Sequence, residues 1–160
     1  MTIRTATVND LFAVTAVEKA CFPPAEAASG AEFADRLAHY ADHFWLLEEE
    51  GRLVAFVDGF VTDEADLRDE MYADASLHNE NGAWQMIFGV NTLPEYRHRG
   101  YATRLLRSAI ADARAQHRLG LVLTCKKQLI PFYARLGFVR EGRSASAHGG
   151  AVWYQMRLRL

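Results

Sequence analysis

The stretch with the most distinctive chemistry runs from Leu93 to Leu106 and reads LPEYRHRGYATRLL. Arg97, His98 and Arg99 stand directly before Gly100, and a helical pattern of apolar residues begins after the glycine. The N-terminus of a helix presents unpaired N–H groups and about half a positive charge. A glycine there lets a ligand approach the backbone closely, and the basic side chains add donors. The stretch therefore suits a pyrophosphate, or else it is a solvated basic turn before an ordinary amphipathic helix.

Other residue types that often do chemistry are few or poorly spaced. Cys21 and Cys125 are the two cysteines, and neither has a metal-ligand or redox spacing. His39 and His43 have the i, i+4 spacing of metal ligands on a helix, but the glutamate of the H-E-x-x-H pattern is missing. We therefore predict no metal site, and we expect a reduced, cytoplasmic protein.

Composition and charge argue against several classes of protein. The 160 residues suit one domain, 1–160, with a substantial core. The net charge of −2 lacks the basic excess that nucleic-acid binding requires, and no apolar run approaches the length of a membrane span. The first residues, MTIRTATVND, lack the basic and apolar regions of a signal peptide. We expect neither nucleic acid nor membrane as a partner, and a monomer or homodimer.

Apolar periodicity predicts the elements that must position the basic turn. Strands are expected over 2–8, 84–90, 119–125, 138–142 and 151–160, with two more inside 43–62 around a turn at Glu50 and Gly51. Helices are expected over 9–22, 31–41, 100–113 and 128–137, and the acidic segment 63–83 is expected to be mostly loop. An antiparallel front half thus leads into a βαβ unit.

The order of these motifs resembles a known family. A buried strand, then RHRGYA opening a helix, then a strand and a short helix ending in PFYARLGF, resembles the GNAT (Gcn5-related N-acetyltransferase) superfamily. The segments CFPPAEAAS, EEGRLVAFVDG, SLHNENG and LTCKKQLIPFYARLGF are similar to its arylalkylamine (serotonin-type) branch and the bacterial relatives of that branch. The resemblance implies an α/β (α+β) GNAT fold, in which a mixed, mostly antiparallel central sheet carries a splayed βαβ cleft for acetyl-CoA and is flanked by helices.

The resemblance also implies where acetyl-CoA, the cosubstrate, is held. The basic turn takes the place of the family's Q/R-x-x-G-x-G/A motif, which holds the pyrophosphate, and the strand before it supplies backbone groups for the pantetheine arm and the oxyanion. A glycine inside that apolar strand fits a bulge or a splayed edge. The cofactor-binding residues implied are Phe88, Gly89, Val90, Arg97, His98, Arg99, Gly100, Tyr101, Ala102 and Lys126, the last standing where the family often has an asparagine.

Acid and base candidates follow from the same comparison. Tyr133 matches the tyrosine that the family places beside the CoA sulfur, and a phenol can donate a proton to a thiolate. Periodicity alone favours a core aromatic at this position, and the resemblance reverses that preference. His78 and His148 are the candidate bases, because histidine titrates in the right range and both lie on predicted loops. Glu70 and Asp74 are further options for the base.

The expected activity is direct acetyl transfer from acetyl-CoA to a small primary amine, without metal. An arylalkylamine acceptor is the first hypothesis, because Phe22, Phe33, Trp84 and Trp153 could pack against its ring. The two strand histidines of the arylalkylamine branch are replaced here by Trp84 and Met86. The alternatives are a peptide or protein N-acetyltransferase and a non-catalytic acyl-CoA-binding sensor.

Overall fold

A four-stranded antiparallel sheet dominates the amino-terminal half of the molecule. The computed structural model describes residues 1–160. The sheet contains β1 (Thr2–Thr5), β2 (Phe44–Glu49), β3 (Arg52–Asp58) and β6 (Gly89–Thr92), in that spatial order. Because β6 lies at the edge and pairs only with β3, its outer edge keeps free backbone N–H and C=O groups.

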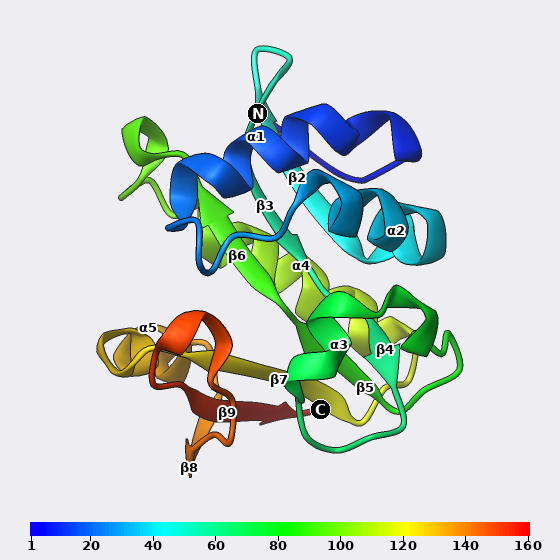
Figure 1. Ribbon diagram of the computed structural model, residues 1–160, viewed down its shortest axis with the longest axis vertical. Coiled ribbons are helices and arrows are strands. Elements are labelled where there is room, and N and C mark those ends of the chain that lie inside the picture. The colour runs from blue at the N-terminus through cyan, green and yellow to red at the C-terminus, as the bar shows by residue number, and fades with distance from the viewer.

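Two neighbouring helices, α1 (Leu11–Cys21) and α2 (Gly30–Tyr40), lie against this sheet (Figure 1). α2 begins at a capping box, in which the Ser29 hydroxyl accepts from the Glu32 N–H and the Glu32 carboxylate accepts from the Ser29 N–H. α1 ends at Cys21, since Phe22 is extended and Pro23 follows it. The two predicted helices are confirmed, and the loop between them is free to reach over the end of β6.

A second sheet of five strands forms the other half. Its order is β4 (Val61–Thr62), β5 (Trp84–Ile87), β7 (Gly120–Cys125), β9 (Tyr154–Arg159) and β8 (Val139–Arg143). Only β5 and β7 run parallel, and α4 (Tyr101–Ala115) lies in the connection between them. The mixed, mostly antiparallel sheet with a βαβ unit and flanking helices is thus confirmed.

The two sheets are joined by a bend in one pair of strands. Gly59 lies between β3 and β4, and a Cβ on it would lie 1.8 Å from the carbonyl oxygen of Met86 in β5. Only glycine therefore allows this segment to approach β5 so closely. Opposite it, the Phe88 N–H donates to the Asp58 carbonyl oxygen at 2.7 Å. Before the bend β5 pairs with β7, and after it β6 turns away from β7, so the two diverge (Figure 1). The segment 84–90, predicted as one strand, is therefore two strands that belong to different sheets.

Short elements complete the chain. The acidic segment contains α3 (Asp69–Ala73), and α5 (Ile130–Arg135) carries Pro131 in its first turn, as predicted. The first strand ends at Thr5 rather than at residue 8, because a capping turn starts at Thr7. None of the helices combines the length and apolar character that a membrane crossing requires.

Candidate active site

A mostly apolar pocket lies where β6 and β7 diverge. One wall is the start of β6, the opposite wall is the end of β7 with α5, and the loop after α1 and the segment before β9 lie around the opening. The structure gathers here five of the residues that the sequence singles out for chemistry: Phe88, Gly89, Val90, Tyr133 and His148. Other members of the predicted set lie elsewhere.

Phe88, Gly89 and Val90 form the wall at the bend. The Phe88 ring packs on Phe60 and Tyr72, with centroids 5.0 and 4.9 Å away, which fixes the bend from the apolar side. Alternate residues of an edge strand direct their backbone groups outward, and β6 has no strand on its outer side. This wall can therefore bind an extended, amide-containing ligand through main-chain hydrogen bonds.

The basic turn follows β6 directly and opens α4. Gly100 is the N-cap with a φ of 79°, and without a side chain it leaves the first N–H groups of the helix free. His98 also has a left-handed φ, 64°. Turns of this kind arrange N–H groups into a concave surface that binds anions. A Cβ on Gly100 would meet no atom within 4 Å, so the space before the helix is open to a ligand.

The two arginines of the turn are held but remain exposed. Arg97 Nε donates to the Thr92 carbonyl oxygen at 3.0 Å, and Arg99 stacks over the Tyr96 ring at 4.9 Å. Arg99 Nη2 also donates to the Glu95 carbonyl oxygen at 3.2 Å, and both side chains stay exposed next to the free N–H groups of α4. The turn therefore combines a helix N-terminus, a left-handed backbone and two cations, which is the chemistry of a phosphate site.

Tyr133 belongs to both the core and the pocket. Its ring packs edge-on against Phe132 and Phe138, and its neighbours Cys125 and Tyr72 line the same pocket. Burial raises the pKa of Tyr133 well above its usual value. The phenol therefore stays protonated at neutral pH, so it can donate a proton but cannot begin the reaction as a base.

His148 and Lys126 tie two remote segments to the loop after α1. His148 Nε2 lies 2.9 Å from the Glu26 carbonyl oxygen, so this nitrogen donates, and Nδ1 of the neutral ring is free to accept. The ring stacks on Tyr72 with centroids 5.1 Å apart. Lys126 Nζ pairs with the Glu26 carboxylate at 2.9 Å and lies over the Trp153 ring. Lys126 thus contacts Glu26 and does not itself line the pocket.

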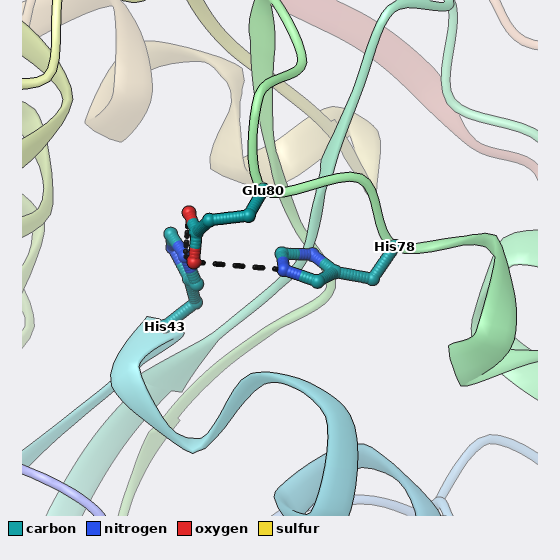
Figure 2. A group of neighbouring side chains, drawn as sticks. All are labelled: His43, His78 and Glu80. Carbon is teal, nitrogen blue, oxygen red and sulfur yellow. Dashed lines mark hydrogen bonds and ion pairs between the residues drawn. The ribbon is translucent and has the colours of Figure 1, made fainter.

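His78 lies outside the pocket, in a cluster with His43 and Glu80 (Figure 2). Its Nδ1 accepts the Val61 N–H at 3.1 Å, so its proton is on Nε2, which points toward Glu80 at 3.7 Å. A metal ion would need the lone pair of that nitrogen. Glu80 is also paired with Arg118 at 2.8 Å. These contacts favour a structural role, in which the cluster holds the turn before β5.

The histidine pair singled out in the sequence separates in the structure. His39 is exposed and its Nδ1 lies 2.9 Å from the Asp35 carbonyl oxygen. His43 is buried, and its Nδ1 donates to the Gln85 Oε1 at 2.8 Å, because the Gln85 amide nitrogen already donates to two carbonyl oxygens. The other proposed bases, Glu70 and Asp74, lie on and directly after α3, and neither lines the pocket.

A buried polar cluster on the β6 wall was not expected from the sequence. Glu18 lines the pocket from α1, and its Oε2 accepts the Ala28 N–H at 2.8 Å. Arg36 from α2 also lines the pocket and pairs with Asp58 on β3 at 2.9 Å. Asn91 on β6 completes the group, and all four side chains are buried. Burial, and after it the neighbouring Asp58 carboxylate, raise the pKa of Glu18 to about 7.

The sequence did contain a signal for this cluster. In α1 the inward stripe is Val14, Val17 and Glu18, and in α2 Arg36 stands between Phe33 and Leu37 on the buried face. Charged residues at core positions of an amphipathic helix are rare unless they are paired or functional. The apolar members of each stripe dominate the helical pattern, and the charged members were not predicted to belong to the site.

The aromatic residues proposed for the acceptor divide into two groups. Phe22 and Trp153 line the pocket. Phe33 is fully buried in the core against Phe44 and Phe56. Trp84 lies on β5 beneath the guanidinium group of Arg157, 4.6 Å from its ring centroid. Only the first two can touch a ligand in the pocket.

Comparison with known proteins identifies the family of this chain and agrees with its fold. The model of the acetyltransferase (GNAT) family matches residues 11–138. This chain belongs to that family. The serotonin N-acetyltransferase of Mesocricetus auratus is 29% identical over 113 residues, which cover 70% of this chain and 53% of that protein. The chain therefore matches about half the length of this curated relative.

Solved structures share the fold at low sequence identity. The GphF GNAT-like decarboxylase in complex with isobutyryl-CoA has a TM-score of 0.86 at 21% identity, covering 99% of both chains. The ribosomal-protein-S18-alanine N-acetyltransferase of Escherichia coli has a TM-score of 0.73 at 19% identity, covering 99% of this chain and 92% of the other. One of these proteins is named a decarboxylase and the other an N-acetyltransferase, so the fold by itself does not specify the reaction.

Proposed function

We propose that this protein transfers the acetyl group of acetyl-CoA directly to the nitrogen of a small primary amine. The observation that carries the proposal is that three binding features follow one another from β6 to the start of α4. The unpaired edge of β6 faces the pocket that holds Tyr133, and the same strand leads into the glycine-capped start of α4. These three features follow the order of the parts of acetyl-CoA. The strand edge can bind the amides of the pantetheine arm, Tyr133 would lie near the thioester, and the start of α4 can bind the pyrophosphate.

The residues of the pocket divide the chemical tasks among them. The Phe88 N–H already donates to Asp58, so the other backbone groups of the Phe88–Val90 stretch, those that β3 leaves unpaired, are proposed to hold the pantetheine arm and to stabilise the oxyanion that forms when the amine attacks the thioester carbon. Tyr133 is the proposed acid for the departing thiolate, because burial keeps its phenol protonated. Direct transfer needs no protein nucleophile. The basic turn, from Arg97 to Ala102, is the proposed pyrophosphate site.

For the acceptor we propose an arylalkylamine such as tyramine or tryptamine. Phe22 and Trp153 in the pocket supply apolar faces against which an aromatic ring can pack. The similarity to a protein named serotonin N-acetyltransferase supports the same class of acceptor. An alkylamine has a pKa near ~10, so only about one molecule in a thousand is the free nucleophile at neutral pH. The site must therefore also remove a proton.

The experiment is a measurement of CoA release with a panel of acceptors at fixed acetyl-CoA. The panel contains tyramine, tryptamine, an aliphatic monoamine, a polyamine and a short peptide with a free N-terminus. We expect the two arylalkylamines to have the highest kcat/KM. Faster turnover of the peptide would contradict the acceptor and support a peptide N-acetyltransferase. If the protein binds acetyl-CoA but releases no CoA with any acceptor of the panel, the result would contradict catalysis and support an acyl-CoA sensor.

A further inference from the structure

Three buried polar atoms approach one position beside Gly89. A Cβ built on Gly89 would lie 3.0 Å from Asn91 Nδ2, 3.0 Å from Asp58 Oδ1 and 3.6 Å from Glu18 Oε1. None of these three atoms has a hydrogen-bond partner within the protein, although each is shielded from solvent. A buried polar atom without a partner costs about 1–3 kcal/mol, so three such atoms around one glycine require an explanation.

A water molecule held between them supplies that explanation. A buried water is stable where two to four polar partners surround it, and here a carboxylate oxygen, a second carboxylate oxygen and an amide N–H converge. Gly89 is the residue that leaves room for it, because any side chain would meet Asp58 and Asn91. The same glycine belongs to the pocket wall, so the water would lie beside the bound acceptor.

We propose that Glu18 is the proton acceptor for the amine, acting through a water molecule that it shares with Asp58 and Asn91. This inference rests on the proposed function and adds a residue to it. Glu18 is favoured over Asp58 because the Asp58 carboxylate is already paired with Arg36 at 2.9 Å. The second oxygen of Glu18 is held by the Ala28 N–H at 2.8 Å, which points Oε1 toward the shared position.

The proton balance of the transfer is complete with these groups. The ammonium substrate loses two protons in all. One passes through the water to the Glu18 carboxylate and then to solvent, and this frees the nitrogen lone pair that forms the C–N bond. The C–S bond breaks as the intermediate collapses, and the Tyr133 phenol protonates the sulfur. The phenolate then recovers the second proton that the nitrogen releases, so free CoA and the amide are the products.

The pKa of Glu18 suits this task. It is raised to about 7, mainly by burial and then by Asp58, while the Ala28 N–H, Arg36 and the Asn91 side chain lower it. A base works best when its pKa is near the operating pH. Cys21 on the same helix is a further titratable neighbour. The remaining titratable residues that line the pocket are Glu26, Glu32, Tyr72, Cys125, Tyr133 and His148.

The experiment compares Glu18→Gln with the wild type across the pH range around 7. Glutamine keeps the volume and an oxygen for the Ala28 N–H, but it cannot accept the proton. Expected are a fall in kcat of about 100- to 10,000-fold, a near-normal acetyl-CoA Kd, and loss of the rise in kcat/KM that the wild type shows near pH 7. Glu50→Gln, on the exposed turn between β2 and β3, is the matched control and should keep wild-type kinetics.

Two other outcomes would overturn the proposal. If Glu18→Gln keeps more than about a third of wild-type kcat with the pH limb intact, and His148→Gln loses the limb, then the proton acceptor is His148. If only KM for the amine rises in Glu18→Gln, then Glu18 binds the cation without accepting its proton. A wild type that releases no CoA with any acceptor would instead contradict the proposed function. Should Glu18→Gln fail to fold, Glu18→Asp tests the same pH limb.

Discussion

The stability of the protein provides an independent test of the Glu18 environment. The pKa of this carboxyl is raised from 4.5 to about 7 in the folded protein. The folded state therefore holds a proton that the unfolded chain has already released between these two values. The contribution of Glu18 to the free energy of unfolding is therefore largest below the pKa of the unfolded chain, 4.5. It falls as the pH rises to the pKa of the folded protein, about 7.

The magnitude can be worked out from the shift. A difference of about 2.5 pKa units corresponds to about 3 kcal/mol, the cost of keeping Glu18 ionised in the folded protein above pH 7. Between about pH 5 and about pH 8 the two-state linkage relation gives a change of about 2 to 3 kcal/mol. Glu18→Gln removes this cost, because an amide has no charge to bury and can donate to Asp58 Oδ1, which lacks a partner.

Urea unfolding at about pH 5 and about pH 8, without acetyl-CoA, measures the effect. We expect the gain of Glu18→Gln over the wild type to be about 2 to 3 kcal/mol larger at the higher pH, or roughly 5–10 °C in Tm. Comparing variant with wild type at each pH cancels the titration of groups that both share. Glu50→Gln removes the same charge from an exposed turn and controls for net charge. An equal gain at both values would refute the argument, because Glu18 would then not titrate in this window.

Three further predictions concern the other parts of the site. Tyr133→Phe keeps the ring packing, so a single-turnover assay should show acetyl transfer slowed about 100- to 10,000-fold with acetyl-CoA affinity unchanged; loss of binding would instead indicate a structural hydroxyl. Gly100→Val should weaken CoA binding by more than about tenfold in calorimetry, whereas Gly51→Val, at a similar φ of 78° with equally open surroundings, should not. Trp153→Leu should lower kcat/KM for tryptamine about two- to tenfold more than for an aliphatic amine; equal losses would exclude ring contact.

Features encoded within a few residues were predictable from the sequence. The turn at Glu50 and Gly51 and the glycine before α4 appear where the pattern places them, and the Ser29–Glu32 capping box, although it was not predicted, is equally local. Each depends on local backbone chemistry, namely a hydroxyl before a helix or a glycine at a positive φ. The basic turn is part of this group, since its glycine and its cations are adjacent in the chain.

Features that depend on which strands pair were not predictable. The apolar run 84–90 reads as one buried strand, because periodicity reports burial and not the identity of the neighbour. Its division at Phe88 is caused by Gly59, almost thirty residues earlier, whose missing side chain admits the Met86 carbonyl. For the same reason His78 and His148, both on loops, are indistinguishable in the sequence, although only His148 reaches the pocket.

The bend between β5 and β6 also determines the environment of the buried polar side chains beside Gly89. Turning β6 away from β7 opens the edge on which a thioester can lie, and it also brings Gly89 against Asp58, Asn91 and Glu18. A carboxyl group placed there is costly to ionise, and the same cost raises its pKa into the range where it can take a proton from an amine. Stability and turnover should therefore move in opposite directions in Glu18→Gln. A variant that gains stability at high pH while losing acetyl transfer would show that one interaction is responsible for both.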